Sequence, residues 1–120
     1  SSQPDVWQRE YGWSINVDKL DLFFRKNLTI YGFKANEIED FIDYWIPRLK
    51  ESDYYSIYPQ TNSIINEVIE LKISKKTDNL LRLFYLIKGY KNPQIKLKTP
   101  IINYFERKGF FVTEWGVILE

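Results

Sequence analysis

The segment NEIEDFIDYWIP, residues 36–47, carries the most explicit folding signal in the chain. Asn36 followed by Glu39 matches a helix N-cap with its capping-box partner three residues later. Pro47 has no backbone N–H and is expected to kink or end the helix. The apolar stripe is Ile38, Phe41, Ile42, Trp45 and Leu49. The segment therefore predicts an amphipathic helix that packs one face on a core.

A second amphipathic helix is predicted just before it, over residues 18–31. Its apolar positions follow steps of three and four residues, and they are Leu20, Phe23, Phe24, Leu28 and Tyr31. Asn16 or Asp18 supplies a side chain that caps the first turn. Gly32 stands where a helix commonly ends in the left-handed conformation. Two consecutive apolar helix faces require a partner layer.

Alternating and β-branched residues predict that this layer is a sheet. An early strand is expected within residues 6–17, and a second one over 54–58 that Pro59 is expected to stop. Residues 64–73 and 80–87 form two β-rich runs, and the second is dense enough to be a central strand.

The end of the chain predicts a short helix and a last strand. Thr99-Pro100 opens a helix that reaches about Lys108, because proline suits the first helical position. A final strand is expected over residues 110–119. The element order predicts an α+β fold with two N-terminal helices packed on a mostly antiparallel sheet. A single domain is expected over residues 6–120, behind a flexible leader over residues 1–5.

The composition excludes many kinds of chemistry. The 120 residues include no His, Cys or Met, and the formal net charge is +1. Disulfides, thiolate nucleophiles, imidazole or thiolate metal sites and a Ser-His-Asp triad are therefore excluded. A nucleic-acid partner is not expected, because the sequence has no concentrated basic face. The inventory predicts a protein that is not an enzyme and that needs no cofactor or metal.

Aromatic residues are the main binding candidates. Rigid aromatic rings stack on sugars or act as binding hot spots at protein interfaces. The candidate binding residues are Trp7, Trp13, Tyr54, Tyr55, Tyr58, Glu114 and Trp115. The alternative, which the helix stripe favours, is that these rings pack the sheet against the helices.

Glu114 raises a second hypothesis. A carboxylate beside a tryptophan has the setting of a general acid with a raised pKa. If the first and last strands pair, Glu10 faces Glu114 as an acid/base pair. Strand residues beside a core aromatic more often point to solvent, so catalysis is the less favoured interpretation.

The first residues, SSQPD, are polar and bear a proline. Removal of an export signal, or a lipid anchor upstream of residue 1, leaves such a stub, and an arbitrary end leaves it equally well. No run is long and apolar enough to predict a transmembrane segment.

The whole chain resembles an uncharacterised domain family of secreted and surface-attached bacterial proteins. The resemblance rests on EDFIDYWIP at residues 39–47 and on RKGFFVTEWG at 107–116, within a likeness that extends from Trp7 to Gly116. Departures are QR at residues 8–9 and SKK at residues 74–76. The resemblance implies an extracytoplasmic protein, secreted or attached to the cell surface, and implies no activity.

Two functions follow from the sequence. The first is a non-enzymatic extracytoplasmic protein-binding module, in one version a peptidase inhibitor whose extended leader or hairpin loop enters the cleft of a secreted peptidase. The alternative is a surface domain that binds carbohydrate or a small ligand on its Trp and Tyr rings.

Overall fold

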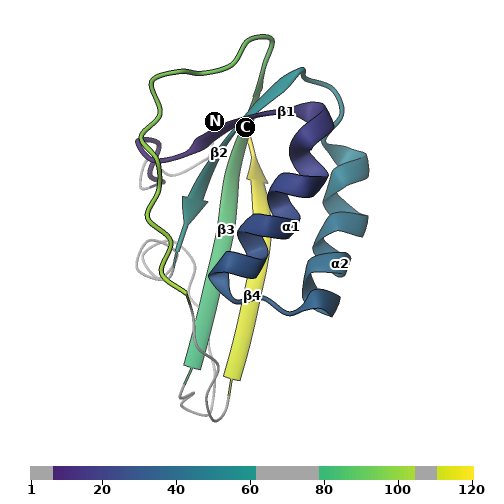
Figure 1. Cartoon of the computed structure of the whole chain (residues 1–120), viewed down its shortest axis with the longest axis vertical. Coiled ribbons are helices and arrows are strands. Elements are labelled where there is room, and N and C mark those ends of the chain that lie inside the picture. Colours follow the sequence, from purple (N-terminus) through teal and green to yellow (C-terminus); the bar gives the residue numbers. More distant parts are fainter. Residues whose placement is uncertain (1–6, 62–78, 105–110) are drawn as a thin grey trace.

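The computed structural model describes residues 7–61, 79–104 and 111–120 (Figure 1). Two helices and a four-stranded sheet form an α+β fold. The helices are α1 (Leu20–Tyr31) and α2 (Ala35–Trp45), flanked by the 3₁₀ turns Val17–Lys19 and Ile46–Arg48. The strands are β1 (Trp13–Asn16), β2 (Tyr54–Gln60), β3 (Asn79–Tyr90) and β4 (Phe111–Leu119).

The sheet is mixed, which corrects the prediction of a mostly antiparallel one. Its order is β1-β2-β3-β4, and β3 pairs with β4 in parallel while the other two pairs are antiparallel. A parallel pair needs a crossover connection, because the chain must return to the same end of the sheet. The two helices lie in sequence between β1 and β2, after the expected early strand, so they are not strictly N-terminal.

Part of that crossover, residues 91–104, runs back along the β1 side of the sheet (Figure 1). The Gly12 N–H donates to the Lys98 carbonyl (2.9 Å), and the Lys98 N–H donates to the Glu10 carbonyl (3.1 Å). These bonds hold the segment extended, and residues 99–104 are not helical. The predicted helix after Thr99 is therefore wrong up to Tyr104, and the rest of it lies outside the described residues.

The helix boundaries follow from local hydrogen bonds. The Asn16 side chain accepts from the Asp18 N–H (2.9 Å), and Gly32 ends α1 with a φ of 108°, as predicted. Helix α2 begins two residues earlier than predicted, because the Lys34 N–H donates to the Glu37 carboxylate (2.7 Å). The expected cap at Asn36 was wrong, and the end of α2 before Pro47 is confirmed.

Strand β2 continues through Pro59 to Gln60, where the sequence predicted a stop. Pro59 lies opposite Tyr85 in the antiparallel pair of β2 and β3. The backbone N–H and C=O groups of Tyr85 point toward β4, so this is a position where β2 and β3 exchange no hydrogen bonds, and the backbone groups of Pro59 face away from β3. Its carbonyl accepts from the Gln8 side chain (2.9 Å) instead. Proline therefore removes no ladder hydrogen bond here. Strand β3 is central, as predicted, and the run 64–73 lies outside the described residues.

The main core lies between the helices and one face of the sheet. Phe24, Phe41 and Tyr85 are fully buried and contact one another, with ring centroids 5.0–5.8 Å apart. The Tyr85 hydroxyl donates to the Asn27 side-chain oxygen (2.5 Å), which satisfies two buried polar groups. A smaller cluster of Trp7, Tyr58 and Leu86 covers the opposite face.

Buried tyrosines make the fold sensitive to alkali. Burial raises the pKa of Tyr31 to about 12 and raises the pKa of Tyr85 well above its usual value. Above pH 10 an unfolded tyrosine loses its proton while the folded one keeps it, so the free energy of unfolding falls as pH rises. We expect each tyrosine to contribute a loss of up to about 1.4 kcal/mol per pH unit. Urea titrations at pH 8, 10 and 11 check this, and equal midpoints at all three would contradict it.

Candidate functional site

The structure buries three of the seven candidate binding residues. Trp7, Tyr55 and Tyr58 are each at most 7 % exposed. The Tyr55 hydroxyl accepts from the backbone N–H groups of Glu51 (3.0 Å) and Ser52 (3.1 Å), so it ties a loop to β2. Rings in these positions offer no face for stacking in this conformation.

The other candidate aromatics are half-buried. The Trp13 ring packs edge-on against Phe23, with centroids 5.2 Å apart, and the Trp115 ring packs against Phe41 at 5.3 Å. Tyr54 starts β2 opposite Tyr90. The seven residues are spread over both faces of the sheet, and the structure does not bring them together as one platform.

Glu114 and Glu10 lie far from each other in the sheet. Glu114 is on β4, at the opposite edge from β1 and the residues that lead into it. Its Oε2 atom is 3.3 Å from Nε of Arg82, and the Glu10 carboxylate accepts from the Lys98 ammonium (2.6 Å). The hypothesis that Glu10 and Glu114 form an acid/base pair is therefore wrong.

The Arg82–Glu114 ion pair supports the fold. The Arg82 side chain is 3 % exposed and the Glu114 side chain 30 % exposed. Glu114→Gln removes the negative charge 3.3 Å from the Arg82 guanidinium, and loss of one member of a largely buried ion pair is destabilising. We expect Glu114→Gln to lower the free energy of unfolding by about 1–2 kcal/mol. Urea denaturation measures this, with Glu39→Gln, an exposed ion-pair partner of Arg25, as the control that loses less than about 0.5 kcal/mol. Equal losses for the two variants would contradict the assignment.

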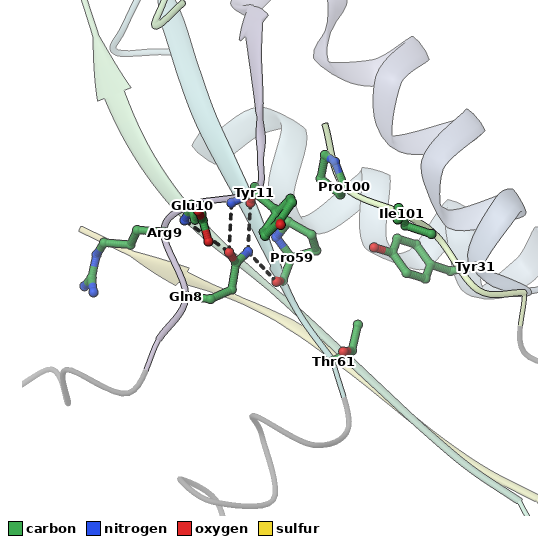
Figure 2. A pocket seen from close by; sticks show the side chains of 9 residues that line it. All are labelled: Gln8, Arg9, Glu10, Tyr11, Tyr31, Pro59, Thr61, Pro100 and Ile101. Carbon is green, nitrogen blue, oxygen red and sulfur yellow. Dashed lines mark hydrogen bonds between the residues drawn. The ribbon is translucent and has the colours of Figure 1, made fainter. Parts of the chain in front are cut away.

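A large open pocket lies beside the β1 edge (Figure 2). Its volume is about 610 Å³, within the usual range for ligand pockets. The lining residues are Gln8, Arg9, Glu10, Tyr11, Tyr31, Pro59, Thr61, Pro100 and Ile101. We call this the Tyr31 groove. Of its residues only Glu10 belonged to a sequence-based hypothesis, as the expected partner of Glu114. The groove itself was not predicted, because it forms where the crossover segment meets residues 8–11.

Gln8 shapes one wall of the groove. Its side-chain oxygen accepts from the Tyr11 N–H (2.9 Å), and its side-chain nitrogen donates to the Tyr11 and Pro59 carbonyls (2.8 and 2.9 Å). The buried Gln60 amide accepts from the Gln8 N–H and donates to the Gln8 carbonyl. The wall is thus rigid, and its polar groups are already bonded.

The charges of the groove are also engaged. Arg9 pairs with Glu120 (2.5 Å), and Glu10 pairs with Lys98. The hydrogen bond from Lys98 to Glu10 raises the pKa of Lys98. Within residues 7–61, 79–104 and 111–120, no three acidic side chains converge on a metal position. The groove offers an apolar surface for binding and no arranged set of reacting groups.

The other candidate surface is the outer edge of β4, at the end of the sheet (Figure 1). The Glu120 N–H donates to the Ile87 carbonyl (2.9 Å), and Ile87 is paired with Leu119. Since backbone groups alternate in direction along a strand, the even-numbered residues of β4 bond to β3. The N–H and C=O groups of Thr113, Trp115 and Val117 therefore point outward from the sheet.

Strand β4 itself carries none of three features that commonly protect an edge strand, which are proline, lysine and a bulge. Strand β4 has nine residues with no proline and no lysine, and its pairing with β3 runs without a bulge from Phe111 to Leu119. Unprotected edges readily accept another strand. In the part of the chain that the structure describes, no further strand pairs with this edge. We call it the β4 edge.

Helix α2 extends beyond the β4 edge. In Figure 1, α1 crosses in front of β3 and β4, while α2 stands on the outer side of β4. The Thr113 hydroxyl donates to the Glu37 carboxylate (3.1 Å), which fixes the start of α2 against the start of β4. A strand added beside β4 would therefore lie beneath α2.

Comparisons of the chain with protein-family models, curated proteins and solved structures found no match. The resemblance to a family of secreted and surface proteins stays a prediction. No helix within the described residues is long and apolar enough to cross a membrane.

Proposed function

We propose that the chain is a non-enzymatic protein-binding module that takes up an extended segment of its partner along the β4 edge. The observation that carries the proposal is the row of outward backbone groups at Thr113, Trp115 and Val117, with no strand paired to them among the described residues. An added strand gains main-chain hydrogen bonds along this row, and its side chains supply specificity.

The surroundings of the edge favour an added strand. Trp115 and Phe41 contact each other, so the sheet and α2 form a continuous apolar corner. Alternate side chains of an added strand extend toward α2, where they are removed from water. Burial of apolar side chains there adds to the backbone hydrogen bonds.

Selection from a random linear peptide library on the full chain tests the proposal. The strongest binder is then synthesised with N-methyl groups placed at one backbone nitrogen at a time. A peptide paired as an edge strand loses affinity at every second position, because only alternate N–H groups face β4. Equal losses at all positions, or no peptide selected, would contradict the proposal.

Peptidase inhibition is the narrower form of this proposal, in the extracytoplasmic setting that the sequence predicts. Peptidases often bind extended chains by strand pairing, so the β4 edge joins the predicted leader and hairpin loop as a candidate contact. Titration of the chain against secreted metallo- and serine peptidases tests it. If no peptidase is inhibited, the inhibitor hypothesis is rejected, but the proposal that the β4 edge binds an extended segment is not.

The Tyr31 groove favours a second candidate function, the binding of a small ligand such as a sugar. Its volume suits one, and Tyr11 presents a ring that is 42 % exposed. Saturation-transfer NMR with a panel of oligosaccharides tests this function. If the saturation-transfer signal persists in a Tyr11→Ala variant, the sugar binds outside the Tyr31 groove.

A further inference from the structure

The chemistry around the β4 edge identifies the kind of segment that fits it. We infer that the partner segment is basic, with Lys or Arg alternating with apolar residues. The inference rests on the proposed function and deepens it. It follows from the carboxylates on both sides of the edge, and from the way α2 excludes a second copy of the chain.

One flank of α2 borders the edge and is acidic. The bond from Thr113 to Glu37 shows that this flank faces the start of β4. Asp40 and Tyr44 follow Glu37 at three and seven residues, so they lie along the same flank. Asp40 is exposed, and within the described residues it forms no ion pair. A segment beneath α2 therefore meets negative charge on its helix side.

The opposite face of the edge also carries a carboxylate. Glu114 is an even-numbered residue of β4, whereas Trp115 packs on the helix side, so Glu114 points to the far face. Its partner Arg82 is almost fully buried, while the Glu114 side chain is 30 % exposed. An incoming side chain beside Glu114 meets the carboxylate rather than the guanidinium. Opposite charges on neighbouring strands stabilise the pair, and like charges destabilise it.

The basic group at the other end of α2 is already engaged. The Arg48 guanidinium lies 3.7 Å from the centre of the Tyr44 ring and donates to the Tyr44 carbonyl (2.5 Å). Arg48 contributes a positive charge near the end of β4. The surface around the β4 edge is therefore most acidic near the start of β4, between Glu37 and Glu114. Basic residues of the segment are expected there.

A second copy of the chain fits the edge poorly. Two β4 strands related by a two-fold axis would place both α2 helices on the same face of a joined sheet. Each α2 stands on the outer side of its own β4 (Figure 1). In the joined sheet the two α2 helices would therefore meet above the two β4 strands, where the axes of packed helices must stay 8–10 Å apart. A single extended segment has no such helix and fits beneath α2.

Three synthetic peptides test the inference: eight residues of alternating Val-Lys, Val-Gln or Val-Glu, each with proline at both ends to limit self-association. Isothermal titration on the full chain at low salt is expected to give the Val-Lys peptide about tenfold higher affinity than the Val-Glu peptide. Salt at 0.5 M is expected to reduce this ratio. The Asp40→Asn variant is expected to reduce it about two- to threefold, whereas Glu39→Gln, on the side of α2 that faces Arg25 of α1, leaves it unchanged.

The other outcomes separate the two proposals. Equal affinities, or preference for Val-Glu, would overturn the inference, while periodic N-methyl effects on the selected peptide still support the proposed function. Absence of any binding at the β4 edge would overturn both. Sedimentation that shows a dimer of the chain, lost in a Val117→Pro variant, would overturn the inference in favour of a second copy.

Discussion

Phe41→Ala is expected to lower the free energy of unfolding by about 3–5 kcal/mol, the usual cost of truncating a buried phenylalanine. Phe41 is fully buried and contacts Phe24, Tyr85 and Trp115, so it joins α2 to α1, β3 and β4 at once. The truncation leaves a cavity where four elements meet, and close-packed neighbours fill it only partly.

Urea denaturation followed by tryptophan fluorescence measures this effect. Since domains of this kind are stable by only about 5–15 kcal/mol, the variant is expected to be partly unfolded at 37 °C. Leu22→Ala is the control, because Leu22 is an exposed apolar residue of α1, and its change is expected to stay within about 0.5 kcal/mol. A loss below about 1 kcal/mol for Phe41→Ala would show that α2 does not pack as described.

Val117→Pro is expected to weaken peptide binding at the β4 edge at least about tenfold. The substitution removes an outward N–H, and the proline ring projects into the space of an added strand. The bonds from β4 to β3 are kept, because they come from even-numbered residues. Gly116 precedes the substitution in an extended strand, which suits the residue before a proline.

The matched control is Val117→Ala, which loses the packing of the same side chain but keeps the N–H. Both variants are expected to lose similar stability, and only the proline variant is expected to lose affinity. The peptide selected from the library serves as the probe in isothermal titration. Equal affinities for the two variants would show that the Val117 N–H takes no part in binding.

Local periodicity predicted the parts of the fold that depend on neighbours in sequence. The stripes that contain Phe24 and Phe41 face the core, Gly32 ends α1, and the run 80–87 lies in the central strand. Each of these signals comes from side chains within one or two turns, or from one strand.

The errors arise where distant segments meet. The signal for a helix at Thr99-Pro100 is local, but the chain there is held by bonds between Lys98 and the backbone of Glu10 and Gly12. Pro59 stays in β2 because its missing donor faces away from β3, a fact that depends on strand order. The earlier start of α2 likewise brings Glu37 to Thr113, a contact that spacing alone does not reveal.

The candidate site was predicted less well than the fold. Aromatic content pointed to Trp7, Tyr55 and Tyr58, which the structure places in the cores. The β4 edge was missed because only the sheet order shows which strand is last. A signal was nevertheless present: the run 111–119 holds no lysine or proline, although lysines are frequent elsewhere in the second half of the chain.

Amide hydrogen exchange by NMR, with and without the selected peptide, tests the central claim most directly. In the free chain, the N–H groups of Thr113, Trp115 and Val117 are expected to exchange fast, and those of Glu114 and Gly116 slowly. Bound peptide is expected to slow the first three at least about tenfold. Three outward groups that are already protected in the free chain, or that stay fast when the peptide is bound, would contradict an open β4 edge that binds a strand.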